Sequence, residues 1–332
     1  MEKLVSILTP CYNTGKYIER LLNSVLLQTY PLIEMFVIDD GSTDNTENVV
    51  LNFIPKFKAR GYSLNYIYQE NQGQSVAINN GLKLVKGEYL AWPDSDDFYT
   101  ANDAIEKMVN HLESLPKEFA LVRCKMNILD ENTLKIIDKR GENGLKEEKW
   151  ELFEDCLRGN FYFYPGCYLA NFSRFLEANG LEIYTEKDAG QNWQMFLPIL
   201  YKFRCTTINE FLFSVLARST SHSRGQYKGI DRTIQKWDAY ERTIIATLDK
   251  IKSMPFNIKE SYKKEVQIQY ALRKFDLAIN YRNFKLMKKY RNILIDNNSY
   301  KVKEKLKFFS AYVPYLRKVF SWISIHIQKI KN

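Results

Sequence analysis

Residues 4–42 read LVSILTPCYNTGKYIERLLNSVLLQTYPLIEMFVIDDGS. Two short apolar runs within it, at 4–8 and 35–38, have the composition of buried strands. Between them, apolar residues at 17–26 recur at helical spacing. A strand, a helix and a second strand within about 40 residues predict a βαβ unit, in which both strands lie parallel in one sheet and the crossover is right-handed.

The alternation of strands and helices continues to residue 130. Further elements are expected as strands at 64–68, 89–92 and 119–126 and as helices at 75–85 and 104–115. This order predicts an α/β fold with a mostly parallel sheet flanked by helices. Helical spacing dominates beyond residue 230. We therefore expect an α/β domain at residues 1–222 and a helical, basic C-terminal region at residues 223–332.

Charge is divided unevenly along the chain. The 332 residues carry a formal net charge of +9. Residues 1–220 hold 23 Lys and Arg against 30 Asp and Glu, a balance of −7, whereas residues 221–332 hold 25 against 9, a balance of +16. Because the basic residues lie outside the expected α/β domain, no nucleic-acid partner is expected.

The overall composition, 45% hydrophobic and 26% charged, is that of a folded soluble protein and excludes collagen-like, disordered and disulfide-scaffold classes. The five cysteines are scattered and form no CxxC pair, which is typical of a reducing compartment. No run approaches the roughly 20 apolar residues that a membrane-spanning helix needs. The first apolar run is also too short for a signal peptide. We expect a cytoplasmic protein.

Polar clusters follow three of the expected strands. Residues 9–13 read TPCYN, residues 39–44 read DDGSTD, and residues 94–97 read DSDD. Ligands of parallel α/β sheets bind at the carboxyl ends of the strands. Carboxylates repel phosphate unless a divalent cation, which prefers oxygen ligands, bridges the two. Taken singly, each acidic cluster is more typical of a turn or a helix N-cap than of a ligand site.

The joint order of these clusters resembles glycosyltransferase family 2, whose members have the GT-A nucleotide-sugar-binding fold. Two further segments carry the resemblance, NQGQSVAINNG at residues 71–81 and GEYLAWPDSDD at residues 87–97. By this resemblance, the expected nucleotide-sugar contacts are Pro10, Tyr12, Asn13, Asp39, Asp40, Asn71, Gly73, Asn79, Asp94 and Ser95. The family commonly has Arg where this chain has Ile78, so one expected contact is absent.

The resemblance also identifies residues 94–96 as a DxD motif, which implies a divalent metal, Mn²⁺ or Mg²⁺. Asp96 is the expected direct ligand, and Asp94 is expected beside it, near hydroxyls of the sugar or ribose. Asp97 either joins them or caps the following helix.

Three residues at or just after the end of the expected α/β domain are further candidates. GT-A enzymes often complete the metal site with a late histidine, which makes His222 a candidate third ligand. The alternative for a lone histidine is a surface or packed position. Arg218 and Arg224 lie close to it in sequence and are candidates for binding diphosphate oxygens.

An inverting transferase needs a carboxylate that takes the proton of the acceptor hydroxyl. The family usually supplies it from a Glu-Asp pair that opens a later helix, but here Gln191 and Asn192 stand in that place, and an amide cannot act as this base. A similar Gly-Gln-Asn-Trp-Gln run occurs in a subgroup of the family. Our hypothesis is that Asp188, with Glu186 in reserve, is the base, while Gln191, Asn192 and Trp193 orient the acceptor. The alternative is that these carboxylates cap the helix.

The last segment, residues 301–332, combines lysines with a helical apolar face. It is expected either to pack on the transferase body or to lie as an amphipathic helix on an anionic membrane surface.

Together these features predict a metal-dependent, inverting, hexosyltransferase-type glycosyltransferase in cell-surface polysaccharide or glycan synthesis. Its expected donor is a nucleotide-diphosphate sugar, UDP-linked, and its expected acceptor is a carbohydrate or a lipid-linked acceptor. The expected location is cytoplasmic, with peripheral contact to the inner face of the plasma membrane if residues 301–332 bind lipid. A catalytically silent sugar-nucleotide or membrane-binding protein is the alternative. A sugar nucleotidyltransferase is disfavoured because no Gly-rich triphosphate loop stands near the N-terminus.

Overall fold

The computed structural model describes residues 2–141, 149–161, 163–218 and 229–312. The chain divides into two compact units. Residues 1–226 and 246–253 form the first, named here the α/β unit, and residues 227–245 and 254–332 form the second, named the helical unit.

The α/β unit contains one mixed sheet with the strand order β3-β2-β1-β4-β8-β6-β9-β5, and β7 pairs with β6 outside this path. Its first half is parallel and consists of β1 (Val5–Cys11), β2 (Ile33–Asp40), β3 (Ser63–Gln69) and β4 (Tyr89–Ala91). Strands β1, β2 and β4 are buried along their whole length, whereas the edge strand β3 is mostly exposed or half-buried. The predicted βαβ start of the chain is confirmed.

The second half of the sheet mixes directions. It consists of β5 (Phe98–Tyr99), β6 (Phe119–Asp130), β7 (Ile136–Arg140), β8 (Tyr168–Asn171) and β9 (Arg204–Ala217). Strand β8 runs antiparallel to β4 and β6, whereas β6 and β9 pair in parallel along most of their length. The α/β class is confirmed, and the parallel character is strongest in the N-terminal half.

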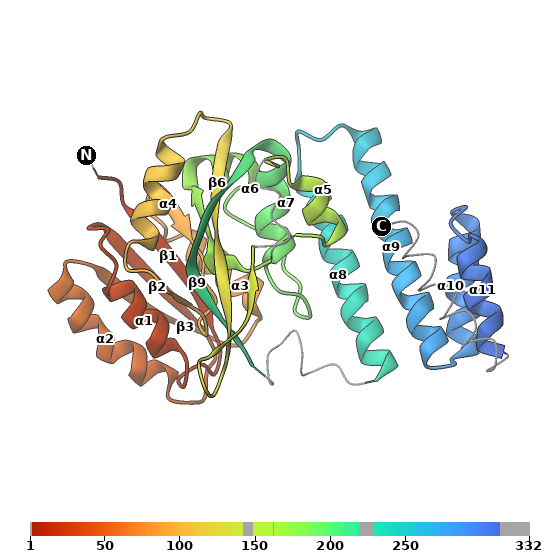
Figure 1. The fold of residues 1–332 in the computed structure, drawn as a ribbon, viewed down its shortest axis with the longest axis horizontal. Helices are drawn as coiled ribbons and strands as arrows, with labels where there is room; N and C mark the ends of the chain where they lie inside the picture. Colours follow the sequence, from red (N-terminus) through yellow and green to blue (C-terminus); the bar gives the residue numbers. More distant parts are fainter. Residues whose placement is uncertain (1, 142–148, 162, 219–228, 313–332) are drawn as a thin grey trace. The chain divides into compact units, whose positions relative to one another are not determined.

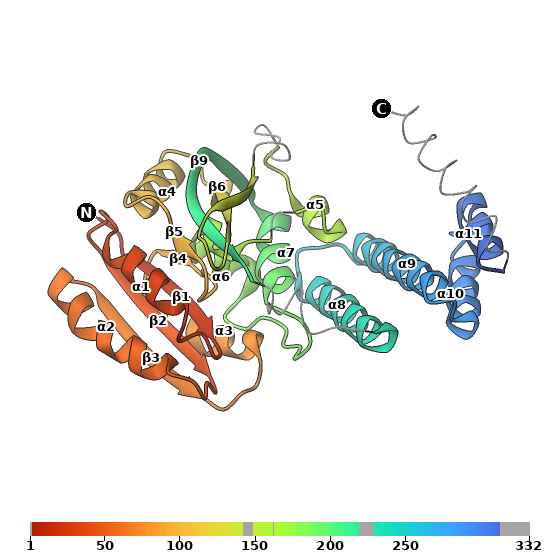
Figure 2. The ribbon, with the colours of Figure 1, turned by 60° about the horizontal axis from the view of Figure 1, so that its bottom comes forward.

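Helices cover both faces of this sheet (Figures 1 and 2). They are α1 (Ile18–Leu26), α2 (Thr46–Arg60), α3 (Gln74–Leu82), α4 (Ala104–Glu113), α5 (Phe153–Arg158), α6 (Phe172–Asn179) and α7 (Asn192–Lys202), with a 3₁₀ turn, η1 (Pro165–Cys167). Helices α1 and α2 lie on one side of β1–β3 and α3 on the other. Helix α3 approaches β1 closely at Gly81, where a Cβ would meet Leu8 Cδ1 at 2.0 Å.

A large aromatic core lies between the sheet and α6 and α7. Trp92 is fully buried there, and its ring centroid lies 6.3 Å from that of Phe175 and 5.4 Å from that of Phe196. The residue directly precedes Pro93 and the aspartate cluster. This packing therefore fixes the backbone from which the acidic side chains project.

The helical unit is built from α8 (Ile230–Lys250), whose last turns belong to the α/β unit, and from α9 (Phe256–Asn280), α10 (Phe284–Asp296) and α11 (Val302–Tyr312). One apolar cluster holds α9, α10 and α11 together, with Phe275, Met287 and Leu294 fully buried. Lys274 is also buried and forms ion pairs with Asp238 and Glu241.

Candidate active site

The polar clusters predicted from the sequence gather at the carboxyl ends of the parallel strands. Cys11 at the end of β1 is level with Asp39 near the end of β2. Strand β4 lies on the other side of β1 and leads directly into the segment of Asp94. This edge of the sheet is where ligands of α/β folds bind.

Asp39 and Asp40 are both buried at the end of β2. Asp39 accepts hydrogen bonds from the backbone N–H of Ser42 at 2.8 Å and from the Tyr66 hydroxyl at 2.8 Å. Burial, followed by the hydrogen bond to the Asp39 carboxylate, raises the pKa of Tyr66, so its hydroxyl stays a donor. Tyr66, on β3, was not identified from the sequence.

The Asp40 carboxylate organises the loop that leads into α3. It accepts from Gln69 Nε2 at 2.7 Å and from the backbone N–H groups of Gln72 and Gly73, each at 2.8 Å. The side-chain amide of Asn71 donates to the Asp40 carbonyl at 2.9 Å. Gly73 has φ +97°, which a residue with a side chain rarely adopts, and stands at the N-cap of α3. Asp40, Asn71 and Gly73 thus form one unit.

The segment after β1 is tied to the segment after β2. Asn13 has φ +51°, its backbone N–H donates to Ser42 Oγ at 2.8 Å, and its Oδ1 accepts from the N–H of Thr43 at 2.8 Å. Pro10 is buried in β1, whereas Tyr12 is 47% exposed. The tyrosine ring is therefore accessible to a ligand at this edge.

Asn79 lies away from these loops, on α3. Its side-chain amide donates to the Ile183 carbonyl at 3.1 Å, and its Oδ1 accepts from the Ile183 N–H at 2.9 Å. The structure thus brings Asn79 to the segment before α7 and not to the end of β2. Its two bonds hold that segment against α3.

The acidic cluster after β4 combines carboxylates that are largely removed from water. Asp94 accepts from Gln74 Nε2 at 3.0 Å and from Gln191 Nε2 at 3.4 Å. Burial, and then the charge of Asp96, raises the pKa of Asp94 to about 7. Ser95 between the two aspartates is buried.

Asp96 and Asp97 have different partners. Asp96 Oδ2 lies 2.7 Å from Nε of Arg218, and burial raises the pKa of Asp96 although this guanidinium opposes the shift. Asp97 Oδ1 accepts from the backbone N–H of Leu216 in β9 at 3.0 Å, and burial raises its pKa well above the usual range. Asp97 therefore connects to β9, and α4 begins only at Ala104.

Arg218 directly follows β9. Among the described residues, it is the cation that forms an ion pair with the aspartates after β4. Its guanidinium carbon lies 4.7 Å from the centre of the Tyr17 ring, so an aromatic face and the Asp96 carboxylate both contact it. Arg224 and His222, the other candidates after β9, lie outside the described residues.

The base candidates lie in the segment before α7. The backbone N–H of Glu186 donates to Ser75 Oγ at 3.2 Å, and a Cβ on Gly73 would lie 3.6 Å from Cα of Lys187. Glu186 and Asp188 are both half-buried. They therefore lie beside the loop that Asp40 organises. The N-cap of α7 is Gln191, so neither carboxylate occupies that position.

The residues that open α7 differ in their surroundings. Gln191 is 1% exposed and contacts Asp94. Oδ1 of Asn192 is buried and accepts no hydrogen bond from the residues that the structure describes. Trp193 donates from Nε1 to the Cys156 carbonyl at 3.2 Å, and its ring lies 5.1 Å from that of Phe163. Trp193 thus packs against the aromatic residues that precede β8.

Sequence reasoning missed Gln74, Tyr66 and the pairing of Arg218 with Asp96. Gln74 follows the predicted loop glycine directly, which is the one local signal for it. The other two depend on which strands become neighbours.

Among the described residues, no group of three or more His, Cys, Asp and Glu side chains is arranged to hold a metal ion. Asp94 and Asp96 nevertheless present two carboxylates close in sequence: the charge of Asp96 contributes to the raised pKa of Asp94, and Asp96 pairs with Arg218. That donor chemistry suits a hard divalent cation.

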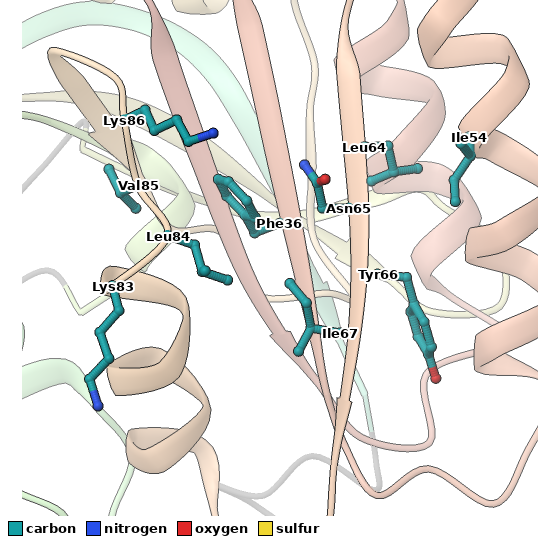
Figure 3. Close-up of a pocket in the computed structure, with 10 residues that line it drawn as sticks. All are labelled: Phe36, Ile54, Leu64, Asn65, Tyr66, Ile67, Lys83, Leu84, Val85 and Lys86. Carbon is teal, nitrogen blue, oxygen red and sulfur yellow. The ribbon is translucent and has the colours of Figure 1, made fainter.

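A cavity of about 600 Å³ lies elsewhere, along the outer strand β3 (Figure 3). Phe36, Leu64, Ile67 and Leu84 line it together with the stem of Lys86 and five other residues. Tyr66, which donates to Asp39, also lines this cavity, but none of the aspartates of the strand-end site does.

Comparison with known proteins gives three kinds of match. A family model described as glycosyl transferase family 2 matches residues 6–176. An uncharacterized glycosyltransferase of Rickettsia typhi is 35% identical over 149 residues, which are 45% of this chain and 44% of that protein. One of Rickettsia conorii is 33% identical over 232 residues, which are 68% of this chain and 35% of that protein. The matched regions thus span less than half of these relatives.

Solved structures share the fold at low sequence identity. Residues 1–349 of S. aureus TarS in complex with UDP-GlcNAc match with a TM-score of 0.63 and 18% identity, covering 95% of this chain and 88% of that one. The Pyrobaculum calidifontis mannosyltransferase PcManGT, in complex with GDP-Man and Mn²⁺, matches with a TM-score of 0.54 and 16% identity, covering 94% and 87%.

The family match spans more than half of the chain and includes the segments after β1, β2 and β4 that form the candidate site. This chain belongs to glycosyltransferase family 2.

Proposed function

We propose that this glycosyltransferase moves a sugar, with inversion at the anomeric carbon, from a UDP-linked donor to a hydroxyl of a glycan or lipid-linked acceptor in cell-surface glycan synthesis. The observation that carries the proposal is the meeting of Asp94, Asp96, Gln191 and Arg218 at the carboxyl ends of the strands. Carboxylates, amides and a guanidinium are the groups that bind a metal, sugar hydroxyls and a diphosphate.

The nucleotide binds, in this proposal, over the ends of β1 and β2. Tyr12 offers an exposed ring, and the buried Asp39 and Asp40 hold the surrounding loops in place through their hydrogen bonds. Pro10, Asn13, Asn71 and Gly73 shape this surface. Asn79 contributes indirectly, through its two bonds to Ile183.

A divalent metal, Mn²⁺ or Mg²⁺, is proposed at the aspartates. Buried carboxylates are costly unless cations compensate them, and Arg218 is the cation that pairs with this cluster among the described residues. Asp96 and Asp94 would hold the ion, and His222 is proposed as a further ligand. When bound, such an ion stabilises the charge that develops on a leaving diphosphate.

Asp188 is proposed as the base, with Glu186 in reserve. As the acceptor oxygen bonds to the anomeric carbon, the hydroxyl proton passes to the Asp188 carboxylate. The bond between the anomeric carbon and the donor phosphate oxygen breaks, and its electron pair leaves with the diphosphate. The amides of Asn192 and Gln191 are proposed to orient the acceptor, and Gln191 links this end of α7 to Asp94.

The amides of Gln191 and Asn192 also favour a second candidate, a silent sugar-nucleotide-binding protein. One experiment separates the two. The chain is tested against a panel of nucleotide sugars with Mn²⁺, first for a rise in unfolding temperature and then for release of nucleotide diphosphate with a glycan acceptor. We expect a UDP-sugar both to stabilise the chain and to be consumed. Stabilisation without turnover of any donor supports the silent protein.

We further propose a cytoplasmic protein with peripheral membrane contact through residues 301–332, of which 301–312 are described. In the described part of the chain, no helix has the length and apolar character to cross a membrane.

A further inference from the structure

The helical unit contains a cavity of about 540 Å³ that has no part in the site above. Its lining comes from α10, from the turn after it and from α11, and consists of Arg291, Ile295, Asn298, Tyr300 and Lys305. Two cationic, two hydrogen-bonding and one apolar side chain thus meet in a space that suits a phosphate group with its substituents.

One donor atom of Arg291 is unsatisfied within the described part of the chain. Its Nε is buried and has no hydrogen-bond partner among the described residues. The guanidinium carbon lies 5.1 Å from the centre of the Phe308 ring, which supports the group by a cation–π contact. An arginine held on a ring, with an unpaired buried donor, is ready to bind an anion.

Two other lysines of the helical unit are compensated by carboxylates, in contrast to the cations of the cavity. Lys307 forms an ion pair with Asp276 at 2.6 Å, and Lys274 one with Glu241 at 2.5 Å. Within the described residues no carboxylate forms an ion pair with Arg291 or Lys305. The surroundings reinforce the excess charge, because residues 281–312 contain nine Lys and Arg and two Asp and Glu. The cavity therefore has a positive potential.

An exposed apolar stripe runs along α11 beside the cavity. Val302, Leu306 and Phe309 are 69%, 39% and 62% exposed, and their spacing of four and three residues places them on one face of the helix. Ile295, which lines the cavity, is 45% exposed. The helix packs on α9 and α10 through another face, that of Phe308 and Ala311. Among the described residues, nothing covers the stripe.

We propose that the cavity and the stripe together dock on a bilayer that contains anionic phospholipid, with a lipid phosphate in the cavity and the apolar side chains at the boundary of headgroups and acyl chains. Apolar side chains beside cations are the combination that such an interface requires. A soluble phosphate compound or a nucleic acid would use the cations and leave the stripe exposed. This inference deepens the membrane contact proposed above and is independent of the catalytic residues.

The test is sedimentation of the full-length chain with vesicles of phosphatidylcholine, with and without phosphatidylglycerol. The pocket variant is R291Q/K305Q. The matched control, K285Q/K289Q, removes the same charge from exposed positions that helical spacing places on another side of α10, about 120° around the helix. Each basic residue at an anionic surface strengthens binding roughly fivefold. We expect the pocket variant to bind mixed vesicles roughly 25-fold more weakly, and the control to lose much less.

The stripe is tested with F309S. This substitution should leave the packing of the core unchanged, because the Phe309 side chain is mostly exposed. We expect binding to mixed vesicles to weaken roughly tenfold, as for the loss of one buried aromatic side chain. Circular dichroism and the unfolding temperature check that each variant is folded. We expect sugar transfer to a soluble acceptor to stay at the level of the unmodified chain. That result separates this proposal from the catalytic one.

Three results would overturn the proposal. One is equal losses in the pocket and control variants, which would mean general electrostatic attraction. Another is equal binding to vesicles of phosphatidylcholine alone. The third is a combined result. The chain is stabilised by free glycerol 3-phosphate or retained on single-stranded RNA in a way that depends on Arg291 and Lys305, and F309S leaves vesicle binding unchanged.

Discussion

Nε of Arg218 lies 2.7 Å from Oδ2 of Asp96, and each side chain is less than one-fifth exposed. The pair connects the end of β9 to the segment after β4, two places that are more than 100 positions apart in the sequence. Arg218 is thus the counter-ion of a cluster in which Asp94 and Asp97 have pKa values raised by burial.

The first prediction concerns this counter-ion. Replacement R218Q should lower the free energy of unfolding by about 3 kcal/mol at neutral pH in a chelator, because breaking a buried pair leaves its partner uncompensated. Mn²⁺ should restore part of the loss. Urea unfolding with and without Mn²⁺ measures both effects. R204Q is the control, since Arg204 pairs with Glu151 at 2.8 Å on the surface and should cost less than 1 kcal/mol. Equal losses in both variants would contradict the role of Arg218.

The second prediction is a pH dependence caused by Asp94. Its pKa rises from an ordinary 3.8 to about 7 in the folded chain. The folded state therefore binds this proton more tightly than the unfolded state, and stability falls as the pH rises from 4 towards 7 and above. Asn is neutral and still accepts a hydrogen bond from Gln74 or Gln191. D94N should therefore be more stable than the unmodified chain at pH 8 in a chelator, by at most about 4 kcal/mol.

Urea unfolding of D94N and the unmodified chain at pH 5 and pH 8 measures this difference. The advantage of D94N should shrink at pH 5, where the aspartate is protonated. A difference that is the same at both pH values would assign the effect to packing and not to titration.

The third prediction concerns the loop into α3. D40N leaves one acceptor oxygen where the carboxylate bonds to Gln69 and to the N–H groups of Gln72 and Gly73. The loss of a buried acceptor should cost about 2 kcal/mol of stability and weaken UDP binding, measured by calorimetry. D138N on the exposed strand β7 is the control and should change neither quantity. Unchanged UDP affinity in a destabilised D40N would place the nucleotide elsewhere.

These contacts show what sequence patterns can and cannot specify. The positions of the strands that lead to Asp39 and Asp94 can be predicted from the sequence. Each strand is an apolar run, and such a run is a local property of the chain. The partner of Asp97 is different, because Leu216 reaches it only through the pairing of β5 with β9 and of β9 with β6. The sequence left Asp97 open between a site residue and a helix cap, and pairing across more than 100 residues determined its partner.

Asn79 illustrates the same limit within the motif. Its place in the segment 71–81 predicted a nucleotide contact, but both polar ends of its side chain bond to Ile183. Local spacing places it correctly on a helix after the loop. Which side of α3 faces the loop before α7 depends on the close approach of Gly81 to Leu8, a packing detail that periodicity does not contain.

The last prediction addresses the base. Asp188 and Glu186 lie two residues apart, in a segment held against α3 by the bond of the Glu186 N–H to Ser75 Oγ. If Asp188 accepts the proton of the acceptor hydroxyl, D188N should lower kcat by about 10²–10⁴-fold, and KM for the donor should change little. E186Q, an equally conservative change two residues away, should lose far less. Calorimetry with UDP should give the same affinity for both variants and the unmodified chain, because neither carboxylate is proposed to hold the nucleotide. Full turnover by D188N together with a large loss in E186Q would move the role to Glu186, and full turnover by both would remove the segment from the chemistry.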